Sequence, residues 1–410
     1  MVAIQAFLGI TPSVADAAEV VALPYDTMSH AEARALILAN PKSFLRIEKS
    51  DAEFADPKMV SPTEIHEKAK ANLKAFLKKG WLVQSDTPCL YVYQQIMNGR
   101  TQTGLVAATS VFEYDAGLIK KHEHTRADKE EERTLHVDIV NANTGPVFLT
   151  YRAMPAMKAI TAELTPKKPD IDVTAEDGIT HRLWCIADPT EIARIEHVFG
   201  SVEALYIADG HHRSKAASLV AERRRARGET VGSHDSFLSV IFPDDELAIM
   251  DYNRVVKDLH GLTPASFLDK LGNDFSVTPV ADAEAARPTQ RREFAMYLKH
   301  QWYKLRLKPE IKLPADAVSQ LDVAILQDRV LAPLLDIQNP RTDQRIDFVG
   351  GIRGYAELEK RCRTDAVVAF ALYPTGIDQM MAIADAGAVM PPKSTWFEPK
   401  LRSGMVTRPL

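Results

Sequence analysis

Short apolar runs alternate along the chain with longer segments in which apolar residues recur every three to four positions. The first pattern is typical of buried strands, and the second of amphipathic helices. Strand-like runs at residues 89–94 and 104–111, and within residues 293–307, are close enough to form hairpins. The alternating segment Ser43–Glu48 is also expected to be a strand. This pattern predicts an α/β to α+β fold with mixed sheets and flanking helices.

A length of 410 residues suggests more than one domain. A new helix is expected to start after Leu262, so we predict one domain over residues 1–262 and a second α+β domain over residues 263–410. The apolar N-terminal segment lacks basic residues and is interrupted by Gly9 and Pro12, which favours a first strand over a signal peptide. No apolar run reaches the ~18 residues needed to cross a bilayer.

The amino-acid composition and net charge limit the kinds of partner that the protein is expected to bind. Apolar residues make up 46% and charged residues 26%, as in an ordinary globular protein, and the net charge of −5 gives no reason to expect nucleic acid or an anionic membrane as partner. Three widely separated cysteines form neither a zinc cluster nor a disulfide framework. We therefore expect a soluble cytoplasmic protein, with an oligomeric state that the sequence leaves open.

Asp209, Gly210, His211, His212 and Arg213 follow an apolar run and precede an alanine-rich segment, so they are predicted to join a strand to a helix. The first amides of a helix have no acceptor within it, and the helix dipole favours an anion there. Gly210 exposes the backbone, and Arg213 can donate two hydrogen bonds to a phosphate. The histidines can move a proton, and Asp209 can accept one or hold magnesium. The alternative is simple helix capping by Asp209.

A highly charged stretch in the first half of the chain holds the second group of candidates. Thr125 is expected to cap a helix that carries Lys129 and Arg133 on one face, four residues apart. Near an anion site these residues would bind phosphate; elsewhere they would form a charged surface helix. Alternatively, His122 and His124 would bind a metal ion if a third ligand came from another segment.

Further candidates lie near both ends of the chain. Asp26 is expected at the end of a strand, where open sheets bind ligands, although an ordinary turn is an equal alternative. Gly350–Gly354 should form a glycine turn, but they match neither a dinucleotide-binding nor a Walker pattern. The tail from Met390 combines prolines with basic residues, among them Lys393 and Lys400, and is either surface decoration or a wall of the anion site.

Several motifs together resemble the uncharacterised family known as domain of unknown function 1015. They are Pro24-Tyr25-Asp26, Asn40-Pro41-x-Ser43-Phe44, His124-Thr125, Asp209-Gly210-His211-His212-Arg213, Asp251-Tyr252-Asn253-Arg254, Gly350-Gly351-x-Arg353-Gly354 and Met390-Pro391-Pro392-Lys393-Ser394-Thr395-x-Phe397. The resemblance covers nearly the whole chain and implies no established reaction.

Around residues 200–225 the chain is also similar to the ParB/sulfiredoxin-like superfamily, which includes nucleotide-binding partition proteins, sulfiredoxins and free-serine kinases. This local resemblance implies a core of that type, in which Gly210, His211, His212 and Arg213 touch nucleotide phosphates. The loop lacks the cysteine of sulfiredoxins, so sulfinic-acid reduction is not expected. The DNA-binding helices of partition proteins have no visible counterpart.

The leading hypothesis is phosphoryl transfer between a nucleotide, ATP or ADP with magnesium, and a small hydroxyl-bearing metabolite that is serine-like. His211, His212 and Arg213 would hold the phosphates, Asp209 or Asp26 would orient and deprotonate the hydroxyl, and Lys393 would neutralise developing charge. The alternatives are a nucleotide- or phospho-metabolite-binding regulator without catalysis, a phosphatase, and a metal hydrolase built on the two histidines of the charged stretch.

Overall fold

The computed structural model describes residues 2–410, which form two compact units. Unit 1 extends to Leu247 and resumes at Pro399, and unit 2 comprises Ala248–Glu398. The sequence placed the boundary after residue 262. The structure has it earlier because the strand Tyr252–Val256 pairs on both sides with strands of unit 2. The last residues of the chain return to unit 1, which the sequence pattern did not indicate.

Unit 1 is built around a mixed sheet, and the predicted fold class is confirmed. Along the sheet the strands are β6 (Ile119–Lys120), β11 (Leu205–Asp209), β8 (Val147–Tyr151), β12 (Ser236–Pro243), β5 (Arg100–Ser110), β4 (Leu90–Met97), β10 (Thr180–Ile186) and β9 (Ile171–Thr174), with β1 (Ile4–Gln5) beside β5. The pairs β6–β11 and β8–β12 are parallel, whereas the others are antiparallel. The expected β4–β5 hairpin is confirmed. Smaller ladders join β2 (Ile10–Pro12) to β3 (Leu82–Gln84) and β7 (Ala142–Asn143) to β21 (Arg408–Pro409).

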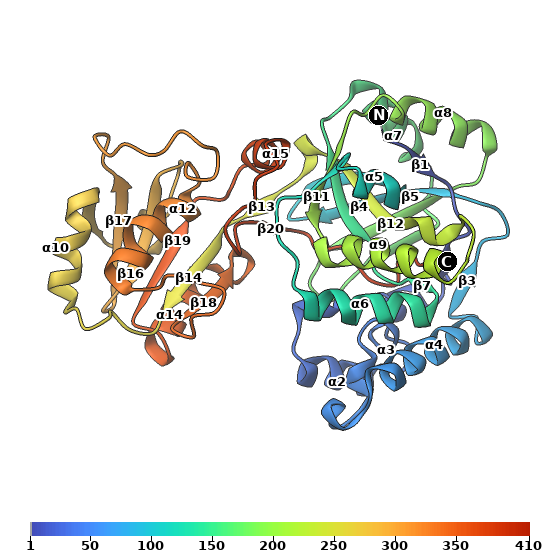
Figure 1. The fold of residues 1–410 in the computed structure, drawn as a ribbon, viewed down its shortest axis with the longest axis horizontal. Helices are drawn as coiled ribbons and strands as arrows, with labels where there is room; N and C mark the ends of the chain where they lie inside the picture. Colours follow the sequence, from blue (N-terminus) through green and yellow to red (C-terminus); the bar gives the residue numbers. More distant parts are fainter. Residues whose placement is uncertain (1) are drawn as a thin grey trace. The chain divides into compact units, whose positions relative to one another are not determined.

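The α-helices of unit 1 are α1 (Ala17–Val20), α2 (His30–Ala39), α3 (Leu45–Glu48), α4 (Pro62–Lys78), α5 (Val111–Asp115), α6 (Ala127–Val140), α7 (Pro155–Leu164), α8 (Pro189–Phe199) and α9 (His211–Ala226). Helices α6 and α9 lie side by side, and α4 packs against α6 (Figure 1). Small buried residues of α9, Ala217 and Ala221 among them, allow it to pack closely on the apolar core of the sheet. Capping boxes at Ser29 and Ser61 start α2 and α4.

The expected strand at Ser43–Glu48 is wrong, because Leu45–Glu48 forms helix α3. An alternating strand buries every second residue on one face. Here Ser43, Phe44, Leu45, Ile47 and Glu48 are all buried, so the segment is enclosed rather than two-faced. At the end of this helix, the carboxylate of Glu48 lies in the interior of unit 1.

Unit 2 has a six-stranded sheet of its own. Its order is β15 (Phe275–Val280), β17 (Gln301–Leu307), β16 (Glu293–Leu298), β19 (Val368–Leu372), β14 (Tyr252–Val256) and β18 (Ile346–Gly350), and the predicted hairpin within residues 293–307 is confirmed. A small ladder pairs β13 (Ile249–Met250) with β20 (Trp396–Phe397). The helices are α10 (Pro264–Asp274), α11 (Ala283–Ala286), α12 (Asp322–Leu326), α13 (Ala332–Leu335), α14 (Gly354–Thr364) and α15 (Ile377–Asp385).

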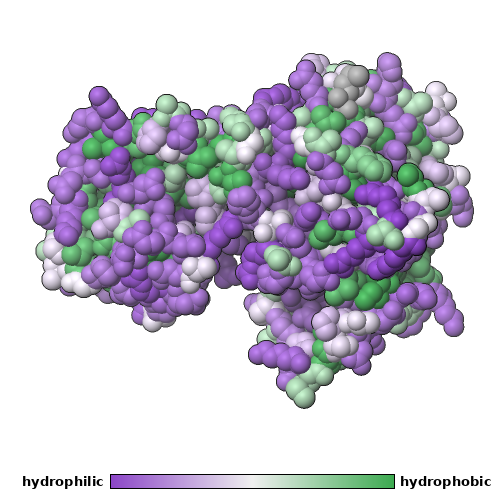
Figure 2. Space-filling model, in the orientation of Figure 1, coloured by the Kyte–Doolittle hydropathy of each residue, from purple (hydrophilic) through white to green (hydrophobic). Residues whose placement is uncertain are grey.

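On the face shown in Figure 2, hydrophilic side chains cover most of each unit, and the apolar patches between them are scattered. Over residues 2–410, none of the helices combines the length and the apolar character that crossing a membrane requires.

Candidate functional site

The predicted turn between a strand and a helix is present at Asp209–Arg213. The register of β11 against β8 shifts between Ile207 and Asp209, an irregularity that redirects the end of a strand. Gly210 follows with φ +98° and ψ +29°, a backbone conformation that favours glycine. Helix α9 begins at His211, so its first-turn amides lie immediately after the strand. The backbone geometry that makes a helix N-terminus favourable for an anion is therefore in place.

His211 is buried and contacts the charged stretch of the chain. Its Nε2 accepts a hydrogen bond from the His122 amide at 3.4 Å, its Nδ1 lies 3.7 Å from a Glu123 carboxylate oxygen, and the two imidazole rings are 4.5 Å apart. Burial lowers the pKa of His122 to about 4 and holds the pKa of His211 well below its usual range. Both imidazoles are therefore neutral at neutral pH, and the His211 ring positions the segment around His122 rather than supplying a positive charge.

His122 and His124 do not form the suggested metal pair. His122 is buried and His124 is exposed, and residues 2–410 contain no group of three or more His, Cys, Asp or Glu side chains arranged to hold a metal ion. The third ligand that such a site requires is missing from the described chain. The metal-hydrolase hypothesis therefore gains no support from residues 2–410.

Arg213 brings together two of the predicted candidates. Its guanidinium donates to the Pro146 carbonyl at 3.0 Å and lies 3.9 Å from a carboxylate oxygen of Asp26. It also lies over the ring of Tyr25, 5.3 Å from the centroid. The Arg213 side chain is 13% exposed, and its Nε is buried without a hydrogen-bond partner. A buried donor without a partner is costly, so Nε is suited to a ligand or a water molecule.

Arg133 also lies over the ring of Tyr25, with its guanidinium 4.1 Å from the ring centroid. Glu132 forms an ion pair with Arg133, and a carboxylate oxygen of Glu48 lies 3.7 Å from the same guanidinium. Burial raises the pKa of Tyr25 to about 12, so the phenol stays protonated beside these two cations. Burial also raises the pKa of Glu48, although Arg133 and Arg213 oppose the shift.

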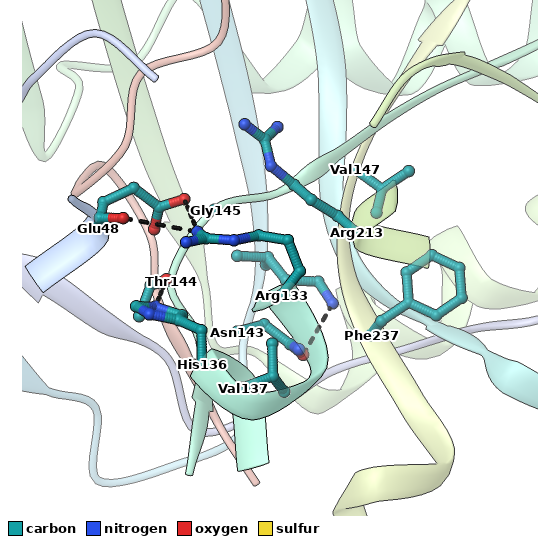
Figure 3. Close-up of a pocket in the computed structure, with 11 residues that line it drawn as sticks. Glu48, Arg133, His136, Val137, Asn143, Thr144, Gly145, Val147, Arg213 and Phe237 are labelled. Carbon is teal, nitrogen blue, oxygen red and sulfur yellow. Dashed lines mark hydrogen bonds and ion pairs between the residues drawn. The ribbon is translucent and has the colours of Figure 1, made fainter. Parts of the chain in front are cut away.

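A small cavity of about 20 Å³ lies between Glu48, Arg133 and Arg213 (Figure 3). Such a volume has room for about one water molecule. Gly145 opens this space: a Cβ there would lie 2.8 Å from Glu48 Oε1 and 3.3 Å from Arg213 Nε. Elsewhere in its lining, the Thr144 hydroxyl and His136 Nε2 are hydrogen-bonded at 2.9 Å. Glu48, Thr144 and Gly145 were not among the predicted site residues.

Lys400 is the basic residue of the tail that reaches this loop. Its ammonium lies 2.9 Å from Asp209 Oδ2, and the side chains are 15% and 39% exposed respectively. Burial alone would raise the pKa of Asp209, but Lys400 and Arg213 together lower it below its ordinary value. Asp209 is therefore a carboxylate rather than a carboxylic acid at neutral pH. The basic character of the tail was the available signal for Lys400, but sequence could not indicate which of its lysines would contact the loop.

The remaining residues of the charged stretch differ from expectation. Arg126, not Thr125, occupies the position before α6, and the Thr125 hydroxyl donates to the Glu130 side chain instead. His212 Nε2 accepts a hydrogen bond from the Arg126 amide at 3.1 Å. Lys129 is exposed, whereas Arg133 on the same helix is buried. The structure therefore places Arg133 beside Arg213 but leaves Lys129 at the surface.

Lys393 and Gly350–Gly354 belong to unit 2, where they form a group of their own. The Lys393 ammonium lies 5.5 Å from the ring centroid of Tyr252, and the buried Arg254 donates to the Lys393 carbonyl at 2.9 Å. A Cβ on Gly350 would lie 2.8 Å from the Trp396 ring. These motifs pack against one another and form a tight loop in unit 2.

Most of the candidate site residues lie in a part of the chain that matches a known protein family. A family described as a protein of unknown function, DUF1015, matches residues 4–324. The chain belongs to this family. The match includes the segments of Tyr25, Glu48, Arg133 and Arg213 and ends before Lys400. The comparison with curated proteins found no match.

Several solved structures are similar at low identity. A free serine kinase in complex with AMP is 14% identical with a TM-score of 0.34, over 72% of this chain and 86% of that chain. A conserved hypothetical protein from Pyrococcus furiosus is 14% identical with a TM-score of 0.33, over 73% and 92%. C-terminally truncated SbnI from Staphylococcus aureus is 11% identical with a TM-score of 0.37, over 73% and 85%. With TM-scores below 0.5, these likenesses carry no argument about function.

Proposed function

We propose that unit 1 binds a nucleotide through its phosphates at the Asp209–Arg213 loop and transfers a phosphoryl group to or from a small hydroxyl-bearing metabolite. The observation that supports this function most is the grouping of three cations at the start of a helix. Arg213 and Arg133 both lie over the ring of Tyr25. Arg213 and Lys400 both lower the pKa of the Asp209 carboxylate, and Lys400 forms an ion pair with it. Positioning and charge neutralisation are the main requirements of phosphoryl transfer.

The residues divide between holding phosphate and handling the hydroxyl. The amides of the first turn of α9 and the Arg213 guanidinium would bind phosphate oxygens. Asp26 or Asp209 would orient the hydroxyl, whose oxygen attacks phosphorus while the bond to the leaving phosphate oxygen breaks. The hydroxyl proton would pass to the carboxylate. His211 and His212 would keep the loop in place through their backbone partners.

The carboxylates beside these cations support the expectation that magnesium enters with the nucleotide. Asp209 is ionised and partly exposed at the loop, so it fits the oxygen ligand that magnesium prefers. Bound magnesium would neutralise phosphate charge. The cavity near Gly145 is far smaller than a nucleotide, so it would form only the inner end of the site.

Incubation with magnesium, ATP or ADP, and a panel of hydroxy-amino acids and sugars tests the proposal, with products identified by mass spectrometry. We expect a phosphorylated product from a small, serine-like hydroxyl compound. Arg213→Lys keeps the charge but loses the two-pronged donor, so nucleotide affinity should fall about 10- to 100-fold by calorimetry. Arg194→Ala, which removes an exposed arginine of unit 1, should leave affinity unchanged.

Other results would assign a different function to the same site. Nucleotide-induced thermal stabilisation without turnover would indicate a regulator. Release of inorganic phosphate from phosphoserine would indicate a phosphatase. If wild-type protein neither binds nucleotide nor forms product, the proposed function is wrong.

A further inference from the structure

Residues 399–410, named here the C-terminal strap, return to unit 1 and are fixed along their length. Ser403 exchanges two backbone hydrogen bonds with Ala22, at 2.9 and 3.1 Å. Thr407 exchanges two with Ile10, both at 2.8 Å, and β21 pairs with β7 beyond that point. The strap therefore has anchors of its own, independent of the side chain of Lys400.

Lys400 is held at the start of this strap. The buried Gln95 donates to the Lys400 carbonyl at 3.0 Å. Two residues further on, the buried Arg402 donates to His181 Nε2 at 2.9 Å and forms an ion pair with Asp177. The backbone at Lys400 and just after it is thus fixed, so the ammonium has a defined place in unit 1.

That place is the candidate phosphate loop. The Lys400 ammonium lies 2.9 Å from Asp209, the residue directly before Gly210. An ammonium has three N–H donors, so it can bind a phosphate oxygen while it remains close to a carboxylate. Lysine is a common phosphate ligand that acts as a point charge, beside an arginine that supplies the two-pronged contact.

A second observation concerns the cavity beside Arg213, the last residue of this loop. Glu48 is 2% exposed, and its Oε2 is buried without a hydrogen-bond partner; the same holds for Nε of Arg213 on the facing wall of the cavity. Native structures pair more than about nine in ten buried polar groups. Two such atoms around one cavity indicate a place for polar ligand atoms next to the loop.

We propose that Lys400 is a phosphate-binding residue of the Asp209–Arg213 loop, delivered by the C-terminal strap and held by Asp209 when no ligand is bound. This inference rests on the proposed function for the class of ligand, a molecule with phosphate groups. It adds a binding residue from the last part of the chain, beyond residues 4–324 that the family match covers.

A purely structural role would give a different pattern of variants. If Lys400 only neutralises Asp209, then Lys400→Ala weakens phosphate binding solely because it exposes an unpaired negative charge. Removing that charge as well would restore binding. If Lys400 binds phosphate, its loss must weaken binding even when Asp209 is replaced by a neutral residue. The double variant separates these two roles.

The experiment measures binding of ADP and of inorganic pyrophosphate to the full chain by calorimetry, without metal and in EDTA. Asp209→Asn should bind both more tightly than wild type, because a negative charge next to the phosphates is removed. Lys400→Ala in the Asp209→Asn background should bind about 10- to 100-fold more weakly than Asp209→Asn alone. Lys168→Ala, which removes an exposed lysine of unit 1, serves as the charge-matched control.

Equal affinities of the Asp209→Asn variants with and without Lys400 would overturn the inference. Abolished binding in a folded Asp209→Asn variant would also overturn the inference, because removing a negative charge from a phosphate site should strengthen binding. Wild-type protein that binds pyrophosphate but not ADP would refute the proposed function while leaving the Lys400 test valid. Binding of neither refutes both.

Discussion

Three residues of the Asp209–Arg213 loop contribute different physical properties to it. Gly210 supplies a backbone conformation that other residues rarely adopt, His211 supplies a buried neutral ring that contacts the segment of His122, and Arg213 supplies a fixed charge. A Cβ on Gly210 would meet the Cα of Val147 at 3.4 Å, an ordinary contact. The requirement for glycine at this position therefore comes from the backbone angle and not from lack of space.

Gly210→Ala should lower the free energy of unfolding of unit 1 by about 1–2 kcal/mol, because alanine is strained at φ +98°. Gly228→Ala, at φ +88° just after α9 in open space, imposes a similar strain away from the loop. Denaturant unfolding should show comparable losses for the two variants. Only Gly210→Ala should also weaken nucleotide binding, by about tenfold, since it shifts the amides that face the ligand. Equal binding by both variants would show that the loop backbone does not contact phosphate.

Sequence predicted this loop because its causes are local: an apolar strand, a glycine and the start of a helix lie in succession. It could not predict Lys400, which is 191 positions away from its partner Asp209. Glu48 was missed for another reason. The alternation of its segment predicted a strand, whereas burial on all sides made the segment a short helix. Contacts between distant segments are fixed by packing, which a single sequence does not specify.

The C-terminal strap is the element that completes unit 1. It has little regular structure, and most of its side chains are nevertheless buried. Arg402 makes the main polar contacts of the strap: it forms an ion pair with Asp177 and donates a hydrogen bond to His181. His181 in turn is hydrogen-bonded to the Tyr93 hydroxyl at 2.7 Å. Burial lowers the pKa of His181 to about 3, with Arg402 adding to the shift, so the imidazole accepts from Arg402 as a neutral ring.

Arg402→Ala should reduce the free energy of unfolding of unit 1 by about 2–3 kcal/mol, because it leaves a buried acceptor on His181 without a partner. Arg182→Ala, on the neighbouring strand β10, removes an ion pair to Asp172 whose side chains are 37% and 47% exposed. That loss should stay below about 1 kcal/mol. Thermal and denaturant unfolding of both variants provide the comparison. A cost for Arg402→Ala as small as that of Arg182→Ala would mean that the strap is not held by this network.

The two units differ in how protons act on their stability. In the described chain, the histidines whose pKa is lowered all belong to unit 1: His66, His122, His136, His181, His211 and His212. Burial is the main cause in each case. Glu48, Glu113 and Glu246 of unit 1 have a raised pKa and offset part of this effect. In unit 2, burial raises the pKa of Asp322 to about 7 and also raises that of Asp251.

These shifts predict opposite responses of the two units to acid. A histidine with a lowered folded pKa binds its proton first in the unfolded state, so unit 1 loses stability as the pH falls from about 6.5 towards 4, by up to ~1.4 kcal/mol per pH unit for each such histidine. In the folded state Asp322 is protonated below about pH 7. In the unfolded chain it stays ionised until the pH falls to its ordinary pKa of 3.8. Unit 2 therefore gains stability as the pH falls from about 7, until the pH approaches 4.5, where Glu293, whose folded pKa is lowered to about 2, begins to bind its proton in the unfolded chain.

Calorimetric unfolding of the full chain at pH 7.5 and pH 5.5 checks this prediction. We expect the transition of unit 1 to move to lower temperature and that of unit 2 to higher temperature. Asp322→Asn identifies the second transition, because a neutral amide still accepts the hydrogen bond from the Arg292 amide but no longer titrates. In this variant the unit 2 transition should lie at a higher temperature than in wild type at pH 7.5. It should then change little between pH 7.5 and pH 5.5. If both transitions shift in the same direction with pH, in wild type and in the variant, the prediction is wrong. Acid lowers the stability contributed by a buried neutral histidine and raises that contributed by a buried carboxylic acid.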